Sequence, residues 1–564
     1  MFVLGIWDGH DAGAALVKGD QIIFAINEER LSRRKLEVGF PSQSINACLK
    51  NTGIPVSAIR EVAVPTSDPA KTLTRLSPRL KEEYYLLRRR KRGPKRLDTL
   101  RKGFKYRFTE LRPNLLSHHL SRLYINKQLG ILGFTDFNLS LPDHHLCHAQ
   151  SAARCSGFEE CLVITLDGVG DGLSGSIWQF KNEQLGLLSK IPSRASLGIF
   201  FEHVTNLMNM RELEDEGKVM ALANYAHPIE DRDNPLMRLI DTRGLDVISR
   251  YSSMGMYQEL KRILWRYPSE QFAFMAQRVL EKNVLSMVRH AIALTGLKRL
   301  SVAGGVFSNI KLNMKIARLD EMKNVFVFPH MGDGGLALGA AMGVNHERFS
   351  VPRYCLKDLS LGPQFSKAAI RSSLDQWPFP YHHLEDVARA AARLLLDGEI
   401  ILWFQGRMEL GPRALGNRSI LARPDKKHIK DRLNLVLKKR VWYQPFCPTI
   451  LFEDAPSLLQ INGQDIRDNR FMTTAFKIQE KYSNLMQGVI NIDGTCRPQF
   501  IGDENPVYRD LLLNMKQELG KGVVLNTSLN IHGEPVVCSP DDALDMFQRT
   551  EISYLFLEDF LVEK

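Results

Sequence analysis

Residues Cys161–Phe180 read CLVITLDGVGDGLSGSIWQF, which is an apolar run, an acidic glycine-containing turn and a second apolar run. This order predicts a buried strand, a tight turn at Asp167–Gly172 and a second strand. Residues 2–27 repeat the order, with an apolar run, the turn Asp8–Gly13 and two more strand-like stretches. Two such units about 160 residues apart indicate an internal duplication. We therefore expect an N-terminal domain built from two related halves that combine strands with helices.

The stretches that follow extend this α/β (α+β) pattern. Apolar residues recur at helical spacing over 255–296, and short apolar strands run into Gly304-Gly305 and Asp333-Gly334-Gly335. Residues 349–366 contain prolines and a glycine without clear periodicity, so we expect a domain boundary there. The predicted domains are residues 1–352 and 360–564.

The 564-residue chain has a formal net charge of +12 at pH 7, and much of the excess lies in one segment. This segment, at about 71–112, contains the run Arg88–Arg96 and is interpreted as a solvated helical insertion into the first domain. The N-terminus lacks a basic leader, and no apolar run is long enough to span a bilayer. The eight cysteines form no C-x-x-C pair, which argues against a zinc ribbon and for a reducing compartment. A cytoplasmic location is expected.

The clearest metal-binding pattern is Asp143-His144-His145-Leu146-Cys147-His148. On a helix, His144 and His148 lie one turn apart on the same face, with Asp143 as the N-cap. Two imidazoles with carboxylates such as Asp167 and Asp333 suit a first-row divalent ion, and Fe(II), Mn(II) and Zn(II) all stay open. The alternative is that both histidines belong to a hydrogen-bond network.

Glycine-containing turns in the first domain suit a phosphate or nucleotide. Asp8-Gly9, Asp167-Gly168 and Asp333-Gly334 each follow an apolar strand, and Gly304-Gly305 ends a strand before a predicted helix. Gly217-Lys218 places a lysine after a glycine, with a solvated helix start as the alternative. The Rossmann G-x-G-x-x-G and the P-loop G-x4-G-K-[ST] are absent, so neither fold is indicated.

The second domain carries arginines inside loops rich in glycine and asparagine. Residues 406–419, GRMELGPRALGNRS, hold three arginines, Lys438 follows, and Arg497 lies in DGTCRPQ at 493–499. The stretch Asn526-Thr527-Ser528-Leu529-Asn530 follows a predicted strand and supplies small polar side chains. Because arginine matches phosphate oxygens bidentately, we expect an anion site in this domain.

Taken together, these motifs closely resemble those of O-carbamoyltransferases of the NodU/CmcH type, known from nodulation-factor and antibiotic biosynthesis. The resemblance covers nearly the whole chain apart from 71–112. The motifs that carry it are His10-Asp11, Glu28-Glu29-Arg30, HHLCHA (144–149), TLDGVGDG (165–172), EGKVMALA (216–223), AGGVFSN (303–309), GDGGLALGAA (332–341), GRMELGPRALGNRSILARP (406–424), DGTCRPQ (493–499) and LNTSLNIHGEP (525–535). The family fold implies a duplicated actin/Hsp70-like N-terminal domain and a YrdC-like C-terminal domain.

The resemblance also implies an activity and its sites. The C-terminal domain would make carbamoyl-AMP from carbamoyl phosphate and ATP, and the N-terminal domain would pass the carbamoyl group to a hydroxyl of a small acceptor. The implied cofactors are Fe(II) or a similar divalent metal and Mg(II), with ATP as cosubstrate. The implied residues are His144, His148, Asp167 and Asp333 for the metal, Lys218, Gly304, Gly305, Asn309, Asn526, Thr527, Ser528 and Asn530 for the nucleotide, and Arg413, Lys438 and Arg497 for carbamoyl phosphate. His10 or Asp11 is the candidate base.

The chain departs from the family pattern at two places. Gln444-Pro445-Phe446-Cys447-Pro448 stands where family members often carry Arg-Pro-Phe-Ala-Pro, which removes one expected phosphate contact. Asn491-Ile492 stands where a histidine is common before the Asp-Gly-Thr motif.

Two other functions compete with carbamoyl transfer. A sugar-kinase-like phosphotransferase of the actin/Hsp70 superfamily would explain the acidic turns but would leave the arginine loops without a role. A nucleic-acid-binding or tRNA-modifying protein of the threonylcarbamoyl type would explain Arg88–Arg96, but few aromatic residues accompany that run. We therefore expect no obligatory nucleic acid. A homodimer is allowed for, and the acceptor, whether a sugar, a glycan or another natural product, stays open.

Overall fold

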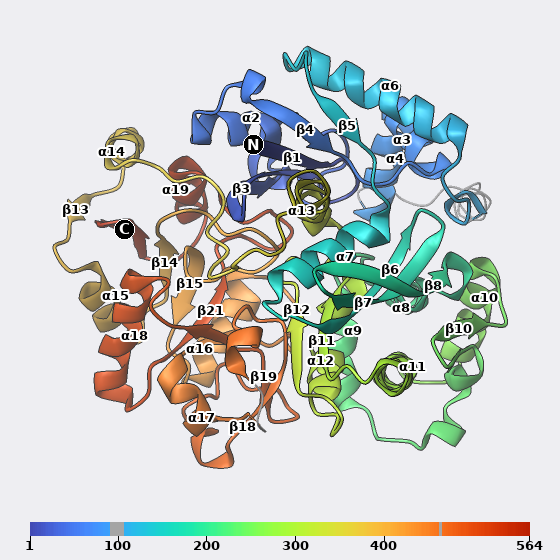
Figure 1. Cartoon of the computed structure of the whole chain (residues 1–564). Helices are drawn as coiled ribbons and strands as arrows, with labels where there is room; N and C mark the ends of the chain where they lie inside the picture. The colour runs from blue at the N-terminus through green and yellow to red at the C-terminus, as the bar shows by residue number, and fades with distance from the viewer. Residues whose placement is uncertain (91–106, 462–464) are drawn as a thin grey trace. The chain divides into compact units, whose positions relative to one another are not determined.

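The computed structural model describes residues 1–90, 107–461 and 465–564 (Figure 1). Its internal contacts divide the chain into two compact units. Unit 1 consists of Met1–Glu28 and Leu36–Cys355, and unit 2 consists of Glu29–Lys35 and Leu356–Lys564. The change of unit after Cys355 falls within the segment 349–366, whereas Glu29–Lys35, placed in the first domain from the sequence, belongs to unit 2.

Unit 1 contains two five-stranded sheets with the same topology. Their strand orders are β3-β2-β1-β4-β5 and β8-β7-β6-β11-β12. In each sheet the first three strands form an antiparallel meander. Two later strands extend the sheet on the other side of the first strand, and they run parallel to it and to each other. The duplication predicted from the two acidic turns is therefore present in the strand order. The strands are β1 Phe2–Trp7, β2 Gly13–Lys18, β3 Gln21–Asn27, β4 Ile59–Ala63, β5 Asn138–Ser140, β6 Cys161–Gly170, β7 Leu173–Lys181, β8 Gln184–Pro192, β11 Arg299–Ala303 and β12 Asn324–Val327, with a separate hairpin of β9 Ile240–Arg243 and β10 Asp246–Ser249.

The strands β1 and β6 are apolar on both faces because helices cover them. Residues 3–7 and 161–166 are buried, which is why these runs read as continuous rather than alternating. Helix α13 packs against β1, β2 and α7, while α7 and α8 pack against β6. The helices of unit 1 are α2 Ser42–Thr52, α3 Pro69–Leu76, α4 Pro78–Arg88, α6 Leu115–Ile131, α7 His144–Cys155, α8 Leu197–Leu207, α9 Glu216–Leu222, α10 Ser253–Leu264, α11 Ser269–Thr295, α12 Ile310–Ala317 and α13 Leu336–Phe349.

Small residues let α13 approach its neighbours closely. A Cβ atom at Gly339 would overlap the Cys147 carbonyl of α7, and a Cβ at Gly5 of β1 would overlap the Ala337 carbonyl. The run LALGAAMG at 336–343 therefore brings the start of α13 against α7, which carries the histidines, and this approach matters for the site.

Unit 2 is built on an eight-stranded mixed sheet of order β13-β23-β22-β14-β15-β21-β16-β20, beside a three-stranded sheet β17-β18-β19. Helices α15 and α18 pack together over the large sheet, around Trp403 and Tyr508. The strands are β13 Tyr381–His383, β14 Ile401–Phe404, β15 Arg418–Ala422, β16 Cys447–Leu451, β17 Leu459–Gln460, β18 Phe476–Ile478, β19 Thr495–Cys496, β20 Gln499–Ile501, β21 Val523–Ser528, β22 Tyr554–Leu557 and β23 Phe560–Glu563. The helices are α1 Glu29–Ser32, α14 Lys367–Leu374, α15 Val387–Leu396, α16 Lys427–Arg432, α17 Ala455–Leu458, α18 Pro506–Leu519 and α19 Pro540–Gln548.

The basic segment is only partly a solvated insertion. Arg75 of α3 is buried and Lys71 is largely so, and they pair with Asp8 at 2.8 and 2.9 Å, so this end of the segment is core rather than surface. Lys91, Arg92, Lys95 and Arg96 lie outside the described residues. Among the helices described, none combines the length and the apolar character needed to cross a membrane.

Candidate metal centre

Helix α7 carries the two predicted metal-ligating histidines. It begins at His144, and the Asp143 side chain caps it by accepting a hydrogen bond from the Leu146 backbone N–H at 3.0 Å. His144 and His148 are four residues apart, so one turn of the helix brings their rings to the same side, with ring centroids 4.9 Å apart. Each is 1% exposed, which means that both imidazoles point into the protein rather than into solvent.

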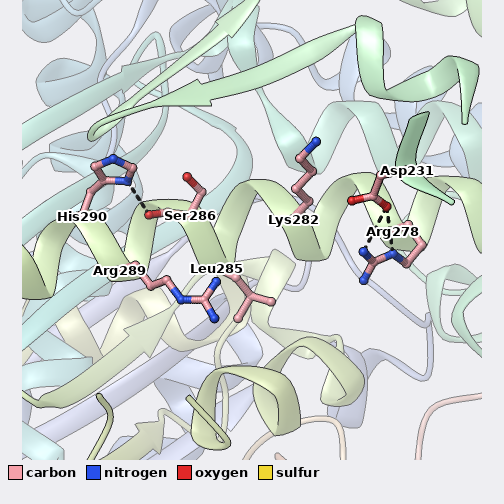
Figure 2. A pocket seen from close by; sticks show the side chains of 7 residues that line it. All are labelled: Asp231, Arg278, Lys282, Leu285, Ser286, Arg289 and His290. Carbon is pink, nitrogen blue, oxygen red and sulfur yellow. Dashed lines mark hydrogen bonds and ion pairs between the residues drawn. The ribbon is translucent and has the colours of Figure 1, made fainter. Parts of the chain in front are cut away.

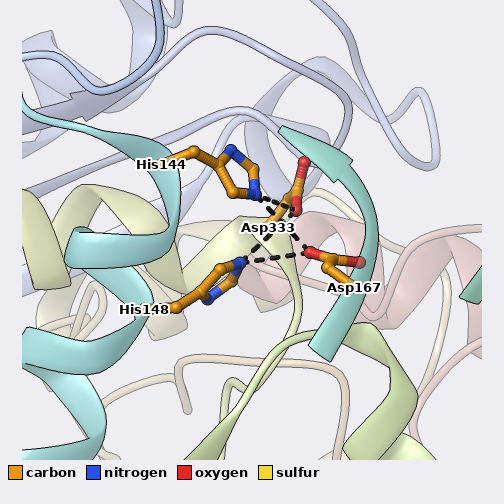
Figure 3. A group of neighbouring side chains, drawn as sticks. All are labelled: His144, His148, Asp167 and Asp333. Carbon is orange, nitrogen blue, oxygen red and sulfur yellow. Dashed lines mark hydrogen bonds and ion pairs between the residues drawn. The ribbon is translucent and has the colours of Figure 1, made fainter. Parts of the chain in front are cut away.

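Two aspartates from other elements complete the cluster (Figure 3). Asp167 lies in β6 and Asp333 at the start of the turn that leads into α13. One ligand atom from each of the four residues lies within 4.8 Å of all the others. The His148 Nε2 atom is 3.1 Å from Asp167 Oδ2 and 3.7 Å from Asp333 Oδ1, and the His144 Nε2 atom is 3.6 Å from each of the same oxygens.

These separations fit a single small cation. Ligand atoms arranged tetrahedrally at about 2.1 Å from an ion are about 3.4 Å from one another, close to the distances between these nitrogens and oxygens. The Nε2 atom of His144 is buried, and no described residue forms a hydrogen bond with it. Two neutral imidazoles and two carboxylates form a donor set that first-row divalent ions accept. Metal binding stays a prediction that the geometry fits.

The electrostatics of the cluster favour added positive charge. Burial lowers the pKa of His144, but the Asp333 and Asp167 carboxylates outweigh burial and raise it to about 9. Burial raises the pKa of Asp167, but the neighbouring imidazoles of His144 and His148 hold it well below its usual range. The buried Asp333 carboxylate and the partly buried Asp167 carboxylate together need about two positive charges nearby, and one divalent ion would supply them.

A second layer of residues holds His144 in place. The Thr66 hydroxyl lies 3.1 Å from His144 Nδ1, which leaves Nε2 to face the aspartates. The Asp171 carboxylate accepts from the backbone N–H of His144 at 2.9 Å and from that of Ser67 at 3.1 Å. Gly170 lies against the ring, because a Cβ atom there would overlap Cγ, Cδ2 and Nδ1 of His144.

The predicted base candidates lie beside this cluster. The Nε2 atom of His10 is 3.4 Å from Asp333 Oδ2, and burial lowers the pKa of His10. The Asp11 carboxylate lies against Gly334. The backbone carbonyl of Asp11 accepts a hydrogen bond from the Asn27 side chain. Asp8, from the same acidic turn, is instead paired with Lys71 and Arg75 and is not available to a cation.

The predicted nucleotide residues of unit 1 divide into two groups. Gly304 has a left-handed backbone with φ of 102°, and a Cβ atom at Gly305 would lie 3.0 Å from Asp167 Oδ1, so this turn borders the metal cluster. Asn309 instead caps α12 through Leu312 N and bonds Gln277, which engages its side chain in the fold. Lys218 pairs with Asp215 at 2.8 Å.

Unit 2 concentrates three arginines around the predicted phosphate site. Burial and the charge of Arg497 lower the pKa of Arg413 to about 9. Burial also lowers the pKa of Arg440 to about 10, with Arg497 contributing. The Nε atom of Arg413 is buried and has no hydrogen-bond partner within the described part of the chain, while Arg497 Nε donates to Cys447 Sγ at 3.1 Å. Partly buried cations that repel one another in this way would be stabilised by an anion.

Arg440 lies beside the segment that departs from the family pattern. Its guanidinium lies 4.1 Å from the centre of the Phe446 ring, and its Nη2 atom donates to the Pro445 carbonyl at 3.4 Å. The Oε1 atom of Gln444, which stands where an arginine is common, is buried without a hydrogen-bond partner among the residues described. Arg440 thus places a guanidinium next to Pro445, although position 444 carries glutamine rather than arginine.

The remaining predicted residues of unit 2 hold the loop after β21. The Nζ atom of Lys438 donates to the carbonyl oxygens of Ser528 and Asn530 and to Asn530 Oδ1, so its three N–H groups all serve this loop. The side chain of Asn526 donates to oxygens of Ala414, Thr449 and Gln499. The Ser528 hydroxyl donates to Asn530 Oδ1 at 2.6 Å, and Thr527 follows Asn526 in the same strand. In this arrangement Lys438 positions the loop rather than facing an anion.

Comparison with known families finds a matching family model for each of the two units. The family model for the carbamoyltransferase N-terminus matches residues 3–342, and the model for the carbamoyltransferase C-terminus matches residues 392–564. The chain belongs to the carbamoyltransferase family. The resemblance recognised in the sequence motifs is thereby confirmed, as is the expectation of an enzyme of this class.

Relatives of this carbamoyltransferase include a nodulation protein and an O-carbamoyltransferase. It is 33% identical to nodulation protein NolNO of Sinorhizobium fredii, over 98% of this chain and 79% of that protein. It is 30% identical to the 3'-hydroxymethylcephem-O-carbamoyltransferase of Streptomyces clavuligerus, over 62% of this chain and 64% of that one. Among solved structures, T. kodakarensis HypF matches 61% of this chain and 47% of its own with a TM-score of 0.33 and 13% identity. A TM-score this low says nothing about activity.

The carbamoyltransferase also has a surface hollow that contains none of the predicted site residues (Figure 2). Asp231 and one face of α11 from Arg278 to His290 line it. Arg278 pairs with Asp231 at 3.0 Å and His290 bonds the Ser286 carbonyl at 2.7 Å, so two of its polar groups are engaged locally.

Sequence reasoning missed several residues that shape the two sites. Thr66 and Asp171 hold His144, and Glu409 shapes the glycine-rich loop by accepting from the backbone N–H groups of Leu415, Asn417 and Arg418. Asp171 lies in the quoted acidic turn, and Glu409 lies in the quoted arginine loop, so a signal existed for both. Thr66 had none, because an isolated threonine after a strand has no distinctive spacing.

Proposed function

We propose that this protein is an ATP-dependent O-carbamoyltransferase. In this proposal unit 2 makes carbamoyl-AMP from carbamoyl phosphate and ATP, and unit 1 passes the carbamoyl group to a hydroxyl of a sugar, a glycan or another natural product. The observation that carries the proposal is the buried cluster of two histidines and two aspartates within a chain of the carbamoyltransferase family. A cluster of this kind is expected where a carbonyl must be polarised for attack by a hydroxyl.

The proposed first stage takes place among the arginines of unit 2. Carbamoyl phosphate is hydrolysed to carbamate and phosphate, and a carbamate oxygen attacks the α-phosphorus of ATP while the bond to pyrophosphate breaks. Arg413 and Arg497 neutralise the phosphate groups, and Arg440 supplies the cation that Gln444 does not. Mg(II) is expected to accompany ATP, as it does in other nucleotide-using sites. Lys438 acts indirectly, by holding Asn526–Asn530 where the nucleotide is expected.

The proposed second stage takes place at the cluster of unit 1. His144, His148, Asp167 and Asp333 would hold Fe(II) or a similar divalent ion, which when bound polarises the carbamoyl carbonyl. The acceptor hydroxyl attacks the carbonyl carbon, AMP leaves, and the hydroxyl proton passes to a base. His10 is the preferred base because it lies against Asp333, with Asp11 as the alternative. Gly304 and Gly305 give the AMP portion of the intermediate an approach to Asp167.

The repeated strand order supports the assignment of unit 1 to the actin/Hsp70-like folds, and we propose a YrdC-like fold for unit 2. The proposed domains are residues 1–352 and 360–564. A cytoplasmic location, in which carbamoyl phosphate and ATP are both present, is part of the same proposal.

The test measures AMP and pyrophosphate production from ATP with and without carbamoyl phosphate, using protein purified anaerobically and assayed with Fe(II) and Mg(II). We expect pyrophosphate only when carbamoyl phosphate is present. ADP formation irrespective of carbamoyl phosphate would instead favour a kinase-like activity and overturn the proposal, as would the absence of any turnover.

Two variants separate the stages. Arg413→Ala is expected to abolish carbamoyl-phosphate-dependent pyrophosphate formation, whereas Asp333→Asn should retain it and lose carbamoyl transfer to a hydroxyl acceptor. Asp136→Asn, which alters an exposed pair with Arg60, serves as the matched control and should leave both stages unchanged.

A further inference from the structure

The positive charge of the chain is concentrated in one stretch. Residues 71–131 contain 18 Lys and Arg but only 4 Asp and Glu, a net charge of +14. The whole chain has 75 Lys and Arg and 63 Asp and Glu, so the rest has 57 against 59 and a net charge of −2. All of the basic excess therefore belongs to α3, α4, α6 and the segment that joins them. Carbamoyl phosphate and ATP do not account for it, because their proposed site lies in unit 2.

Helix α6, at the end of this stretch, is anchored through both polar and apolar contacts. Its core side carries Ser117, Ser121, Ile125 and Leu129, all of them buried. The hydroxyl of Thr72 on α3 lies 2.8 Å from Ser121 Oγ and donates to the Ser117 carbonyl at 3.1 Å, while Arg75 donates to Ser121 Oγ at 2.9 Å. The first half of the helix is thus held to unit 1 by hydrogen bonds, and its second half by the buried side chains of Ile125 and Leu129.

The outward side of α6 is the more apolar side. Leu116, Leu120, Leu123, Lys127 and Ile131 are spaced four, three, four and four residues apart, which aligns them along one face of the helix. Leu116, Leu123 and Ile131 are 68%, 53% and 70% exposed, and Leu115 at the helix start is 92% exposed. Leu73, Leu76 and Leu80 on α3 and α4 are also exposed. A surface helix normally turns its leucines inward, so this arrangement needs a partner to cover it.

Basic side chains accompany the apolar stripe. Lys127 lies within it, and Arg112, just before the helix, is exposed. Arg79 and Arg107 are exposed as well. An apolar stripe with Lys127 within it and Arg112 at its start matches the two layers of a membrane surface, since acyl chains cover the leucines and anionic headgroups attract the cations.

We propose that the outward face of α6, with the basic residues around it, docks unit 1 onto an anionic lipid surface. The charge favours this occupant over a second copy of the chain, because the exposed Arg112 and Lys127 would repel their counterparts on that copy. The exposed leucines favour it over nucleic acid, whose binding sites pair basic residues with stacking aromatic rings. The inference does not depend on the proposed carbamoyl transfer, because lipid binding is measured without turnover.

The test is vesicle flotation of the full chain. We expect binding to mixed phosphatidylcholine–phosphatidylglycerol vesicles, little binding to phosphatidylcholine alone, and weakening as salt is raised. The double variant Leu116→Ser/Leu123→Ser is expected to weaken binding about tenfold, because two apolar side chains no longer enter the acyl region. Arg112→Gln/Lys127→Gln is expected to weaken it about fivefold for each charge removed. Because all four side chains are on the surface, the melting temperatures should stay close to that of the unaltered chain.

The matched control alters an exposed leucine and an exposed lysine elsewhere in unit 1. Leu294→Ser/Lys282→Gln changes α11, where Leu294 is 65% exposed, and should not affect binding. Equal loss of binding in this control would overturn the proposal, because it would show that the α6 face has no special role. So would the absence of lipid binding, tighter binding to RNA than to vesicles, or a dimer in solution that Leu116→Ser/Leu123→Ser dissociates.

Discussion

Replacing Gly170 by alanine is expected to remove metal binding from unit 1 while the sheets stay folded. Gly170 ends β6, and an added Cβ atom would overlap Cγ, Cδ2 and Nδ1 of His144. Its backbone is not in the left-handed region, so alanine meets no conformational penalty and the effect is purely steric.

The size of the effect follows from how His144 is held. Ordinary contacts between heavy atoms are about 3.5 Å or more, so the ring must move by roughly 1 Å. Its Nδ1 atom is fixed by Thr66 and the ring is 1% exposed, so the displacement is passed on to Nε2. Metal–ligand bonds tolerate only about 0.2 Å, and we expect at least a hundredfold loss of affinity together with about 1–3 kcal/mol of overpacking strain.

The assay compares metal content after anaerobic reconstitution with Fe(II), and separately with Zn(II), by mass spectrometry. The melting temperature with and without metal gives a second readout, because an ion that binds only the folded state raises it. Gly186→Ala in β8 is the matched control, since its Cβ atom would lie 3.5 Å from the nearest neighbour, an ordinary contact. Metal affinity in Gly170→Ala equal to that of the unaltered chain would refute the assignment of His144 as a ligand.

Three further outcomes are expected. Asp8→Asn should lower the free energy of unfolding by about 3–5 kcal/mol in urea titrations, because it leaves the buried Arg75 and the largely buried Lys71 without their carboxylate. The exposed substitution Asp136→Asn should cost under about 1 kcal/mol. A small effect of Asp8→Asn would contradict the pairing of Asp8 with these two cations. Burial, with the nearby Glu202 carboxylate, raises the pKa of Glu216 to about 8. The folded state therefore keeps a proton that the unfolded chain loses near pH 4.5. The stability of the fold should fall as the pH rises from about 4.5 to 8. Glu216→Gln should flatten that part of the melting-temperature profile and stabilise the protein at pH 8 by on the order of 2 kcal/mol, and an unchanged slope would count against this pKa. Arg440→Ala should raise the KM for carbamoyl phosphate more than tenfold in the pyrophosphate assay, whereas an unchanged KM would show that Arg440 does not replace the arginine absent at position 444.

Much of unit 1 could be predicted because its signals are local. The strand–turn–strand order of 2–27 and 161–180 is written in consecutive residues, and both stretches form the meanders that begin the two sheets. The four-residue spacing of His144 and His148 needs only a helix to bring the rings together, and α7 supplies one. The assignment of Glu29–Lys35 to unit 2 could not be predicted, because it depends on contacts with residues several hundred positions away, such as Arg30 with Gly411 and Arg33 with Val536.

The grouping of arginines in unit 2 was predicted in kind but not in detail. The arginine-rich loops indicated it, and Arg413 and Arg497 do lie near one another. The sequence could not show that Lys438 and Arg440 have different contacts, because the two residues lie two positions apart in one basic run. In the fold the Lys438 ammonium is taken up by carbonyl oxygens of the 528–530 loop, while the Arg440 guanidinium reaches Phe446 and the charge of Arg497.

The amino-acid sequence by itself determined the family, the duplicated strand pattern and the identity of the four side chains proposed to hold the metal. Only the tertiary structure decided which acidic turn faces which partner. Asp8 and Asp167 occupy equivalent places in the two repeats, yet Asp8 is neutralised by Lys71 and Arg75 from α3, whereas Asp167 faces His144 and His148 from α7. The physical reason is that a carboxylate takes its role from the charges within a few ångströms of it, and those charges come from helices that folding brings to each turn.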